Sequence, residues 1–363
     1  SQDHMKEVIK EHELNRIVVA ACSPRTHEPL FQETIRDAGL NRYLFEMANI
    51  RDQNTWVHMN NKEEATLKAK DLVRMAVAKA AFIEPLHQVS LPINKSILVI
   101  GGGVSGLEAA ASAARQGIEV HLVEKTGVLG GVARQLNATW QGEPVKAYLD
   151  NLTEMVTASD AVTLHLDAQV KDTTGSMGNF ITTIAGNSDA NEVTIEHGAT
   201  VLATGGMEDK PETYLYGKDP AVMTHLDMDA AFKENDPLLE EAGSVVFIQC
   251  VNSRNDENPY CSKICCTHSL KSAIALKKLD RRKRVYVVYR DIRSYGFRED
   301  LYKEARGLGV IFIRYDLEKM PQLRRNSNDQ LELIALDHVL QMDVTINPDL
   351  VVLATGVRAG DNK

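Results

Sequence analysis

A glycine-rich loop between two apolar runs is the feature that most constrains how this chain can fold. The loop spans residues 101–106, with the sequence Gly-Gly-Gly-Val-Ser-Gly, and follows the apolar run 97–100. An alanine-rich segment comes next, and then a second apolar run, 120–123, which ends at Glu124. This order of strand, glycine loop, helix, strand and acid is typical of a βαβ unit that binds a dinucleotide. The middle of the chain is therefore predicted to be a parallel α/β domain.

The residue types in this unit each have a mechanical role. Gly101 permits the tight turn, Gly103 lets a pyrophosphate approach the backbone, and Gly106 lets the helix pack closely on the sheet. The N-terminus of that helix attracts phosphate charge. Glu124 can accept hydrogen bonds from ribose hydroxyl groups. The predicted binding residues of the unit are Gly101, Gly103, Val104, Ser105, Gly106, Glu124 and Lys125.

Two further segments favour FAD over NAD as the dinucleotide. Gly130 and Gly131 follow the acid closely, and Ala203-Thr204-Gly205 closes a later apolar run. Both features resemble flavoproteins with two dinucleotide-binding domains, in which the glycine pair lies beside the flavin and the Ala-Thr-Gly segment approaches the cofactor. In those proteins the position of Val170 meets adenine through its backbone. An ordinary buried strand residue explains Val170 equally well.

A second βαβ unit, later in the chain, lacks its glycine loop. The apolar run 244–249, a helix-like stretch from about 267 to 279 and the run 284–289 have the required spacing, and the run 349–356 ends in another Ala-Thr-Gly. Residues 250–254, Cys-Val-Asn-Ser-Arg, stand where the glycines would be needed. A phosphate cradle cannot be built from such bulky residues. A nicotinamide site is therefore not expected.

Cysteines take the place of the missing loop. They are Cys250, Cys261, Cys265 and Cys266. Four soft sulfur ligands on one turn suit an iron-sulfur cluster or zinc. The last two precede a helix whose N-terminal dipole stabilises thiolate charge, and Arg254, Lys263 and Lys271 add positive charge nearby. A cluster is the favoured interpretation. The alternatives are zinc, whose structural sites favour paired C-x2-4-C knuckles, a disulfide between Cys265 and Cys266, and inert buried thiols.

The composition excludes several classes of protein. The 363 residues carry a net charge of -9 without a basic stripe, which argues against a nucleic-acid partner. No apolar run approaches the ~20 residues of a membrane helix, and residues 1–6 have no signal-peptide core. Five cysteines, four of them clustered, are typical of ligands in a reducing compartment. We therefore expect a cytoplasmic protein with no membrane span.

Three domains are predicted along the chain. Residues 1–86 form a small α/β domain with a strand at 16–21 and a long linking helix from about 62 to 81. Residues 87–240 form the FAD-binding domain, and residues 241–363 form a modified NAD-like domain that carries the cysteine site. A polar, acidic passage from 207 to about 242 separates the last two. The predicted fold class is α/β, with two Rossmann-like domains.

The cysteine array, the flavin fingerprint and residues 18–28, Val-Val-Ala-Ala-Cys-Ser-Pro-Arg-Thr-His-Glu, together resemble heterodisulfide reductase of the HdrA type. The similarity covers essentially the whole chain. It implies a core of the thioredoxin-reductase type, with three-layer β/β/α domains, that carries FAD and a [4Fe-4S] cluster ligated by the four cysteines. It also implies that Lys271 lies near the flavin N5 atom. A solvated helix lysine explains Lys271 equally well.

The resemblance also implies partners and a mode of action. In the best-understood members of the family, the flavin accepts electron pairs and splits them between a low-potential ferredoxin and a higher-potential disulfide. The expected partners are other heterodisulfide reductase-type subunits and a ferredoxin, or a hydrogenase or formate dehydrogenase as electron donor. A homodimeric core is expected as well.

The chain departs from the family pattern in several respects. Upstream sequence, ferredoxin-type cysteines after the flavin domain and a terminal flavin-contacting segment, all usual in relatives, are absent, so we expect a fragment or a split form. Cys22 stands where relatives place a cluster ligand, but Asn54 stands where many of them have cysteine. A complete N-terminal cluster is therefore not expected, and Cys22 alone is more often a small buried hydrophobic residue.

The sequence thus predicts an oxidoreductase subunit that relays electrons between FAD and a [4Fe-4S] cluster. An NAD(P)H-dependent disulfide reductase is the first alternative, but it would need a nicotinamide site and usually a C-x-x-C in the flavin region, and neither is found. A non-catalytic flavin-binding assembly protein, with zinc in its second domain, is the other.

Overall fold

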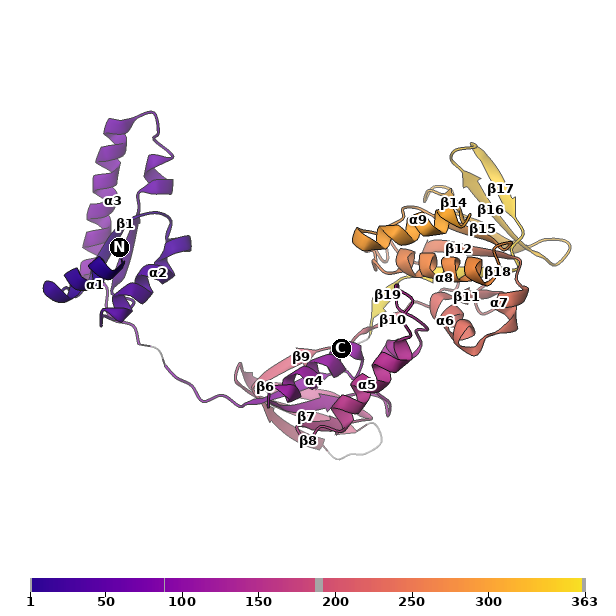
Figure 1. The fold of residues 1–363 in the computed structure, drawn as a ribbon, viewed down its shortest axis with the longest axis horizontal. Coiled ribbons are helices and arrows are strands. Elements are labelled where there is room, and N and C mark those ends of the chain that lie inside the picture. Colours follow the sequence, from indigo (N-terminus) through magenta and orange to yellow (C-terminus); the bar gives the residue numbers. More distant parts are fainter. Residues whose placement is uncertain (1, 88, 187–191, 361–363) are drawn as a thin grey trace. The chain divides into compact units, whose positions relative to one another are not determined.

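The computed structural model describes residues 2–87, 89–186 and 192–360. The chain divides into two compact units, Ser1–Leu91 and Pro92–Lys363. Figure 1 shows the course of the chain through both units. Among the described residues, no helix is both long and apolar enough to cross a bilayer.

The first unit is a small α/β domain. Its two strands are parallel, and their register runs from Ile17 opposite Phe45 to Ala21 opposite Asn49. Ile35 is fully buried against this pair and fixes the core. The predicted strand at 16–21 and the long helix at 62–81 both form, to within one residue. The elements are α1 (Gln2–Glu11), β1 (Ile17–Ala21), α2 (Pro24–Asp37), β2 (Phe45–Asn49), the π-helical turn Arg51–Thr55 and α3 (Lys62–Phe82).

The second unit begins with a four-stranded parallel sheet in the order β5-β4-β3-β9. Leu107 and Ala110 of the first helix and Leu152 of the second are fully buried against the sheet, because their apolar faces recur at helical spacing. The elements are β3 (Ser96–Ile100), α4 (Val104–Arg115), β4 (Glu119–Val123), the 3-10 turn Gly131–Arg134, α5 (Val145–Thr157), β5 (Val162–His165) and β9 (Ala199–Leu202).

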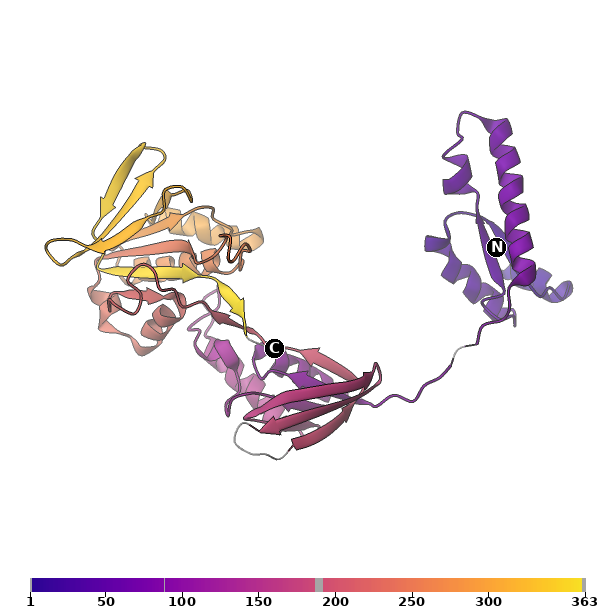
Figure 2. The same cartoon turned by 180° about the vertical axis from the view of Figure 1, so that it is seen from behind.

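An antiparallel layer covers the other face of this sheet. It consists of β6 (Ala168–Ser176), β7 (Asn179–Gly186) and β8 (Glu192–His197). Ile184 and Ile195 of this layer pack against Leu98 and Val123 of the parallel sheet. Figures 1 and 2, seen from opposite sides, show α4 and α5 on one face and the antiparallel strands on the other. The domain therefore has the predicted three layers.

A second three-layer domain follows, built on a parallel sheet in the order β11-β18-β12-β13-β14. Seven of the eight residues of β12 are buried, as expected for a central strand covered on both faces. Its antiparallel layer is β15-β16-β17. The elements are β11 (Val222–Thr224), α6 (His225–Glu234), α7 (Pro237–Glu241), β12 (Ser244–Val251), α8 (Cys265–Leu279), β13 (Arg284–Tyr289), the 3-10 turn Gly296–Arg298, α9 (Glu299–Gly307), β14 (Ile311–Arg314), β15 (Gln322–Arg325), β16 (Leu331–Asp337), β17 (Met342–Ile346) and β18 (Leu350–Thr355).

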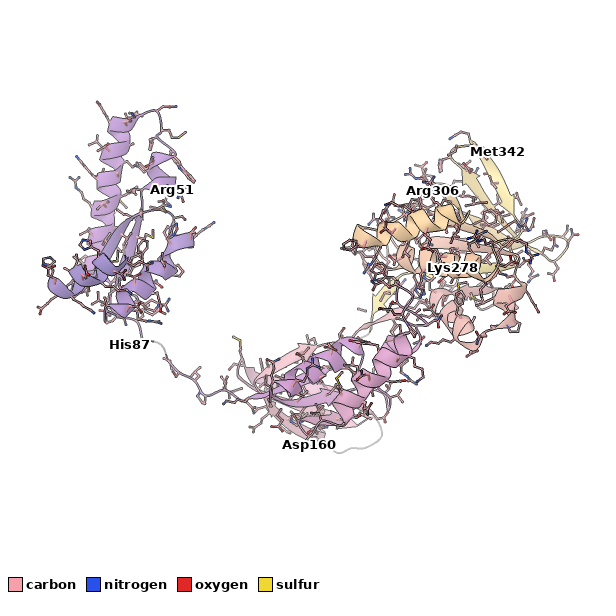
Figure 3. The ribbon with its side chains drawn as sticks, viewed as in Figure 1. Arg51, His87, Asp160, Lys278, Arg306 and Met342 are labelled. Atoms are coloured by element: carbon pink, nitrogen blue, oxygen red, sulfur yellow. The ribbon has the colours of Figure 1, made fainter. Side chains whose placement is uncertain are left out.

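Two helices lie side by side on one face of this second sheet. Lys278 of α8 forms an ion pair of 2.8 Å with Glu304 of α9. Figure 3 labels Lys278, and Arg306 further along α9, on this surface. The guanidinium group of Arg306 lies over the ring of Tyr302, 5.7 Å from its centre, which is within the range of a cation–π contact. Helix α8 begins at Cys265, two residues before the predicted start.

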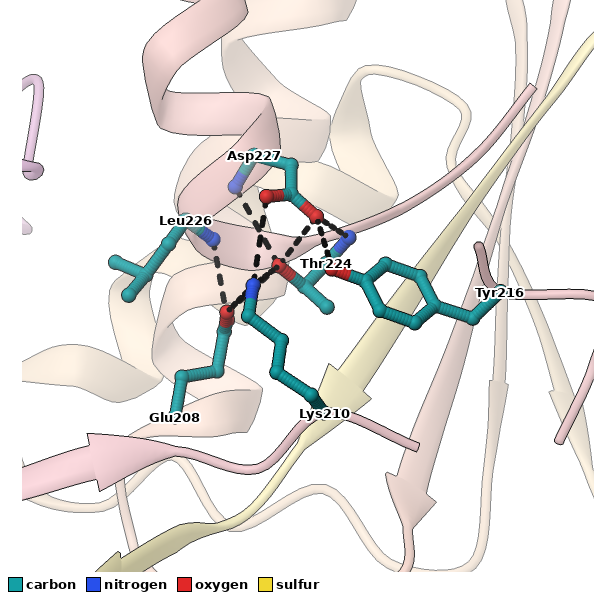
Figure 4. A network of polar contacts seen from close by, with 6 residues as sticks. All are labelled: Glu208, Lys210, Tyr216, Thr224, Leu226 and Asp227. Atoms are coloured by element: carbon teal, nitrogen blue, oxygen red, sulfur yellow. Dashed lines mark hydrogen bonds and ion pairs between the residues drawn. The ribbon is translucent and has the colours of Figure 1, made fainter. Parts of the chain in front are cut away.

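The passage 207–242 contributes to the second sheet, although its polar composition suggested only a separator. Strand β11 pairs with β18, and α6 follows it directly. Thr224 and Asp227 form a reciprocal capping box that starts α6. Glu208 accepts hydrogen bonds from Leu226 N and Thr224 Oγ1, and Lys210 bridges Glu208 and Asp227, as Figure 4 shows. This network ties the connecting strand β10 (Gly206–Glu208) to α6.

The two connections between the dinucleotide-type domains form a short antiparallel ribbon. Strand β10 (Gly206–Glu208) pairs with β19 (Val357–Ala359). Asp209 N also donates to Gly356 O at 2.9 Å, and Arg358 pairs with Asp209 at 2.8 Å. The fold class predicted from the sequence, two Rossmann-like three-layer domains and a small α/β domain, is confirmed.

Candidate functional site

The fingerprint loop has the geometry that its glycines predict. Gly101 has a φ of +110°, and a Cβ there would lie 2.3 Å from Ala203 O. A Cβ on Gly106 would lie 1.8 Å from Gly101 O, so the first turn of α4 can approach the loop only because Gly106 has no side chain. At Gly103 a Cβ would meet no atom within 4 Å. Open space therefore lies beside the N-terminus of α4, where Val104 and Ser105 begin the helix.

Glu124 holds this loop in place. One carboxylate oxygen accepts a hydrogen bond of 2.7 Å from Gly102 N, and the other accepts from both Thr126 N and Thr126 Oγ1 at 2.9 Å. The side chain is only 9% exposed. Glu124 thus orders the backbone of the glycine loop. The sequence had predicted only a contact between Glu124 and a ribose. Lys125, beside it, is exposed.

Three other predicted segments meet the glycine loop. Gly130 N donates to Gly102 O at 2.7 Å, and a Cβ on Gly131 would lie 3.2 Å from Gly103 Cα. Ala203 N donates to Ile100 O at 2.8 Å, which brings Thr204 and Gly205 to the same edge. Gly205 has a φ of +70° and open space at its Cβ position. The fold therefore brings together the glycine loop 101–106, the glycine pair 130–131 and the segment 203–205 around one open space. We call this space the glycine cradle.

Val170 lies on β6, where it is half-buried against the core that joins the two layers. Its backbone pairs with Ile184. This placement is what an ordinary strand residue would have, and contact with adenine stays a prediction.

All four cysteines of the array line one pocket at the carboxyl end of β12. The other lining residues are Ser253, Arg254, Ser262, Lys263, Asp291 and Arg293. All five cysteines of the chain are free, so Cys265 and Cys266 form no disulfide here. Within the described ranges, no three His, Cys, Asp or Glu side chains are grouped as they would be around one metal ion.

The cysteine loop reaches this shape through left-handed backbone conformations at residues other than glycine. The φ angles are +61° at Cys250, +52° at Asn252, +60° at Arg254 and +61° at Lys263. Such conformations cost on the order of 1 kcal/mol or more each and persist only where surrounding contacts determine them. Asn258 supplies part of that support, because its side chain donates to Asn252 O and its carbonyl accepts from Arg254 N.

Burial raises the pKa of three thiols of the pocket, those of Cys250, Cys265 and Cys266. It raises the pKa of Cys265 to about 12 and that of Cys266 to about 11, and the neighbouring thiols add to both shifts. The Cys265 thiol donates to Thr355 O at 3.2 Å, and the Cys266 thiol donates to Asp291 O at 3.6 Å. Metal ligation requires thiolates. A metal centre bound here would therefore have to displace these protons, and four cysteines in one pocket are the soft donors that an iron-sulfur cluster or zinc prefers.

Two arginines near this pocket, of which Arg293 lines it, were not among the predicted site residues. Arg290 and Arg293 follow β13, and their charges lower the pKa of Cys250 and Cys266, respectively, against the larger effect of burial. The carboxyl ends of adjacent parallel strands meet at one edge of a sheet. The sequence Arg-Asp-Ile-Arg directly after the run 284–289 was therefore the signal that could have found them.

Lys271 does not line the cysteine pocket, and its charge contribution there stays a prediction. Its ammonium group donates to Ala138 O at 3.0 Å and pairs with Asp229 at 3.3 Å. The side chain is 16% exposed, which also excludes the solvated helix lysine. His268 approaches the same carboxylate at 3.2 Å. Helix α8 thus carries the thiols at its start and directs Lys271 toward the first dinucleotide-type domain.

Comparison with known proteins agrees with this geometry. Residues 96–148 match the family model described as FAD dependent oxidoreductase. An iron-sulfur HdrA protein of the CoB-CoM heterodisulfide reductase of Methanopyrus kandleri is 31% identical, covering 99% of this chain and 69% of the relative. The corresponding HdrA protein of Methanocaldococcus jannaschii is 32% identical, covering 98% and 68%. The chain belongs to the HdrA family of heterodisulfide reductases.

This membership makes the chain part of a family of FAD-dependent oxidoreductases, and FAD is the cofactor that the findings support for the glycine cradle. The HdrA protein of the H(2):CoB-CoM heterodisulfide,ferredoxin reductase of Methanothermobacter marburgensis is 31% identical over 440 aligned residues, covering 96% of this chain and 66% of the relative. The chain thus spans about two thirds of the length of these HdrA proteins. Among solved structures, thioredoxin reductase of T. acidophilum is 16% identical, with a TM-score of 0.47 over 72% of this chain and 77% of that one.

In this HdrA-type chain, Asp229→Asn should lower the free energy of unfolding by about 3 to 5 kcal/mol. Burial alone would raise the pKa of Asp229, but the hydrogen bonds and charges of His268 and Lys271 hold it below its usual value. Removing the buried anion leaves the Lys271 ammonium group and the His268 ring without their partner. Urea denaturation measures the loss. Asp150→Asn, which removes an exposed pair with Lys146, is the control and should change little.

Unfolding of the same chain should depend on pH through His225. Burial, and then the charges of His268 and Lys271, hold the pKa of His225 well below its usual 6.5. Above pH 6.5 neither the folded nor the unfolded chain binds the proton. As the pH falls below 6.5, the unfolded chain gains a proton that the folded chain does not, so the free energy of unfolding falls by up to about 1.4 kcal/mol per pH unit.

The variant His225→Gln tests this slope. Urea denaturation at several values between about pH 5 and 7 should show a weaker pH dependence in the variant than in the wild type, whatever the variant's absolute stability. His12→Gln, at an exposed histidine, is the control and should show the same pH dependence as the wild type. An equal slope in His225→Gln and the wild type would show that His225 binds its proton equally well in the folded and the unfolded chain.

Proposed function

We propose that this chain relays electrons between FAD, held in the cradle at residues 101–106, and a [4Fe-4S] cluster held by Cys250, Cys261, Cys265 and Cys266. The observation that carries the proposal is that four free cysteines line one pocket where a dinucleotide domain would hold its second glycine loop. When bound, FAD exchanges electrons singly or in pairs and the cluster exchanges one at a time.

The residues of the cradle would bind and orient the flavin dinucleotide. The open space at Gly103 and the N-terminus of α4 suit the pyrophosphate, because backbone N–H groups and the helix dipole favour negative charge there. Glu124 keeps the loop in this conformation through its bonds to Gly102 and Thr126. Ala203-Thr204-Gly205 would form the wall beside the isoalloxazine ring.

The residues of the cysteine pocket would hold an anionic cluster. Cys265 and Cys266 begin α8, whose N-terminal dipole stabilises negative charge. Arg254, which lies 3.8 Å from the Cys250 sulfur, and Arg293 add compensating positive charge. Ser262 Oγ accepts from Val357 N at 2.8 Å and so fixes the loop against the start of β19.

Lys271 would link the two sites on one helix. Its buried pairing with Asp229 and its hydrogen bond to Ala138 O hold the ammonium group against the flavin domain. We propose that this charge stabilises the reduced flavin. Lys271 follows the thiols at the start of α8 by less than about two turns of helix, which keeps the two sites mechanically coupled.

The proposed partners follow from the family. The relatives are named as parts of heterodisulfide reductases, and one of them belongs to the ferredoxin:CoB-CoM heterodisulfide reductase of Methanosarcina mazei. We propose that this chain likewise works with further heterodisulfide reductase-type subunits and exchanges electrons with a ferredoxin, a hydrogenase or a formate dehydrogenase. Division of electron pairs between two acceptors, and a homodimeric core, belong to the same proposal.

Metal analysis of anaerobically purified protein tests the proposed cofactor set. We expect about four iron and four sulfide per chain, the content of one [4Fe-4S] cluster. Zinc without iron would support the alternative of a flavin-binding assembly protein and would contradict the relay.

A further inference from the structure

We propose that the rim of the cysteine pocket is a docking surface for an acidic one-electron carrier protein. This carrier surface consists of two partly exposed loops, residues 254–265 and residues 290–298. The inference rests on the proposed function, since it identifies where electrons leave or enter the cysteine pocket.

The carrier surface exposes aromatic side chains that a soluble domain usually buries. Phe297 is 84% exposed and Tyr295 is 57% exposed, both at the 3-10 turn after β13. Tyr260 and Ile264, which flank Cys261, are each about half exposed. Aromatic residues and arginine are enriched where protein partners bind most strongly. Such residues around one pocket indicate a protein partner rather than solvent.

The two loops meet at the cysteine pocket itself. Asp291 and Arg293 of the second loop line it together with the four cysteines. The Cys266 thiol donates to Asp291 O at 3.6 Å. A partner that covers Tyr295 and Phe297 would therefore lie close to the sulfur atoms of the pocket. Electron transfer favours such a short separation.

The charge of the carrier surface is opposite to that of the chain. Its two loops hold five cations, Arg254, Lys263, Arg290, Arg293 and Arg298, against the three anions Asp256, Glu257 and Asp291, whereas the whole chain carries -9. Asp291 is already paired with Arg254 at 2.6 Å and with Arg293 at 3.5 Å. An acidic protein is thus attracted to this surface, whereas the same positively charged surface of a second copy of this chain is repelled.

Binding of an acidic 2[4Fe-4S] ferredoxin to the intact chain tests the docking surface. The variants are Phe297→Ser, which removes the most exposed aromatic ring of the two loops, and Arg298→Glu, which reverses a charge that lies over Tyr295 and does not line the pocket. The matched controls are Val339→Ser, which is 91% exposed on the β16–β17 turn, and Arg281→Glu, in the turn before β13 at the opposite edge of the sheet.

Both test variants should weaken ferredoxin binding by about tenfold or more in Kd, while both controls should bind like the wild type. The Arg298→Glu effect should shrink between about 0.02 M and 0.5 M salt, because screening removes long-range attraction, whereas the Phe297→Ser effect should persist. Equal binding by all variants, or self-association of the chain through Phe297, would overturn the docking surface.

Iron content, measured on the same samples, separates this inference from the proposed function. Because the assay measures association and not electron transfer, ferredoxin binding that depends on Phe297 in an iron-free protein would support the docking surface and contradict the cluster. A full iron content together with ferredoxin binding that is unchanged by Phe297→Ser would support the cluster and contradict the docking surface.

Discussion

Cys261→Ser should remove the [4Fe-4S] cluster, or convert it to a form with fewer irons, while leaving the flavin bound. The Cys261 side chain is half-buried, and its sulfur accepts one long hydrogen bond, 3.4 Å from Lys263 N, which a serine oxygen can replace. The loop should therefore fold as before, but a hydroxyl is a poor ligand for iron compared with a thiolate. We expect the iron-to-flavin ratio to fall by most of its value, with unchanged circular dichroism.

Cys22→Ser is the matched control for this experiment. Cys22 lies in the first unit, and its sulfur contacts Arg51 at 3.4 Å. The same substitution there removes a sulfur without touching the pocket, so iron and flavin should both stay at wild-type levels. Full iron retention in Cys261→Ser would exclude Cys261 as a ligand. Loss of iron and flavin in both variants would show that cysteine-to-serine substitution destabilises the chain as a whole.

Gly103→Leu should have the opposite effect, abolishing FAD binding while the cysteine pocket keeps its iron. The backbone φ of Gly103 is -75°, which leucine can adopt, and no atom lies within 4 Å of the Cβ position. The side chain can therefore fill the space that the pyrophosphate needs without disturbing the fold. We expect FAD affinity to fall by on the order of a hundredfold, about 2.7 kcal/mol, by flavin fluorescence titration.

Substitutions at two other glycines serve as comparisons for this result. Gly307→Ala, at the end of α9, meets no atom within 4 Å and should bind FAD normally. Gly106→Ala should instead unfold the domain, because its Cβ would lie 1.8 Å from Gly101 O. If Gly103→Leu bound FAD as tightly as the wild type, the open space at the start of α4 would not be the phosphate site.

The parts of the fold that could be predicted from sequence are those encoded within one stretch of chain. The run 97–124 specifies a strand, a glycine turn, a helix and a strand in sequence order, and the structure follows it closely. The placement of the cysteine array could be predicted equally well, because Cys250 lies near the end of one strand and Cys265 begins the next helix. Local periodicity and turn chemistry suffice for such features.

Other features depend on contacts between distant segments and left no local signal. Strand β11 is only three residues long and enters the sheet by pairing with β18, far along the chain, with Val222 opposite Val351. Asp229 lies 42 residues from Lys271, and an acidic residue on an amphipathic helix usually faces solvent. The buried pairing of these two residues, and so the direction of Lys271, could be found only from the folded structure.

The most direct test of the proposed cluster, on which the relay depends, is an EPR spectrum of the anaerobic protein recorded during stepwise reduction with dithionite. We predict that the signal of a reduced [4Fe-4S] cluster appears in the wild type, is lost in Cys261→Ser, and persists in Gly103→Leu, which lacks flavin. Absence of any cluster signal in the wild type at full reduction, with flavin bleaching complete, would contradict the account.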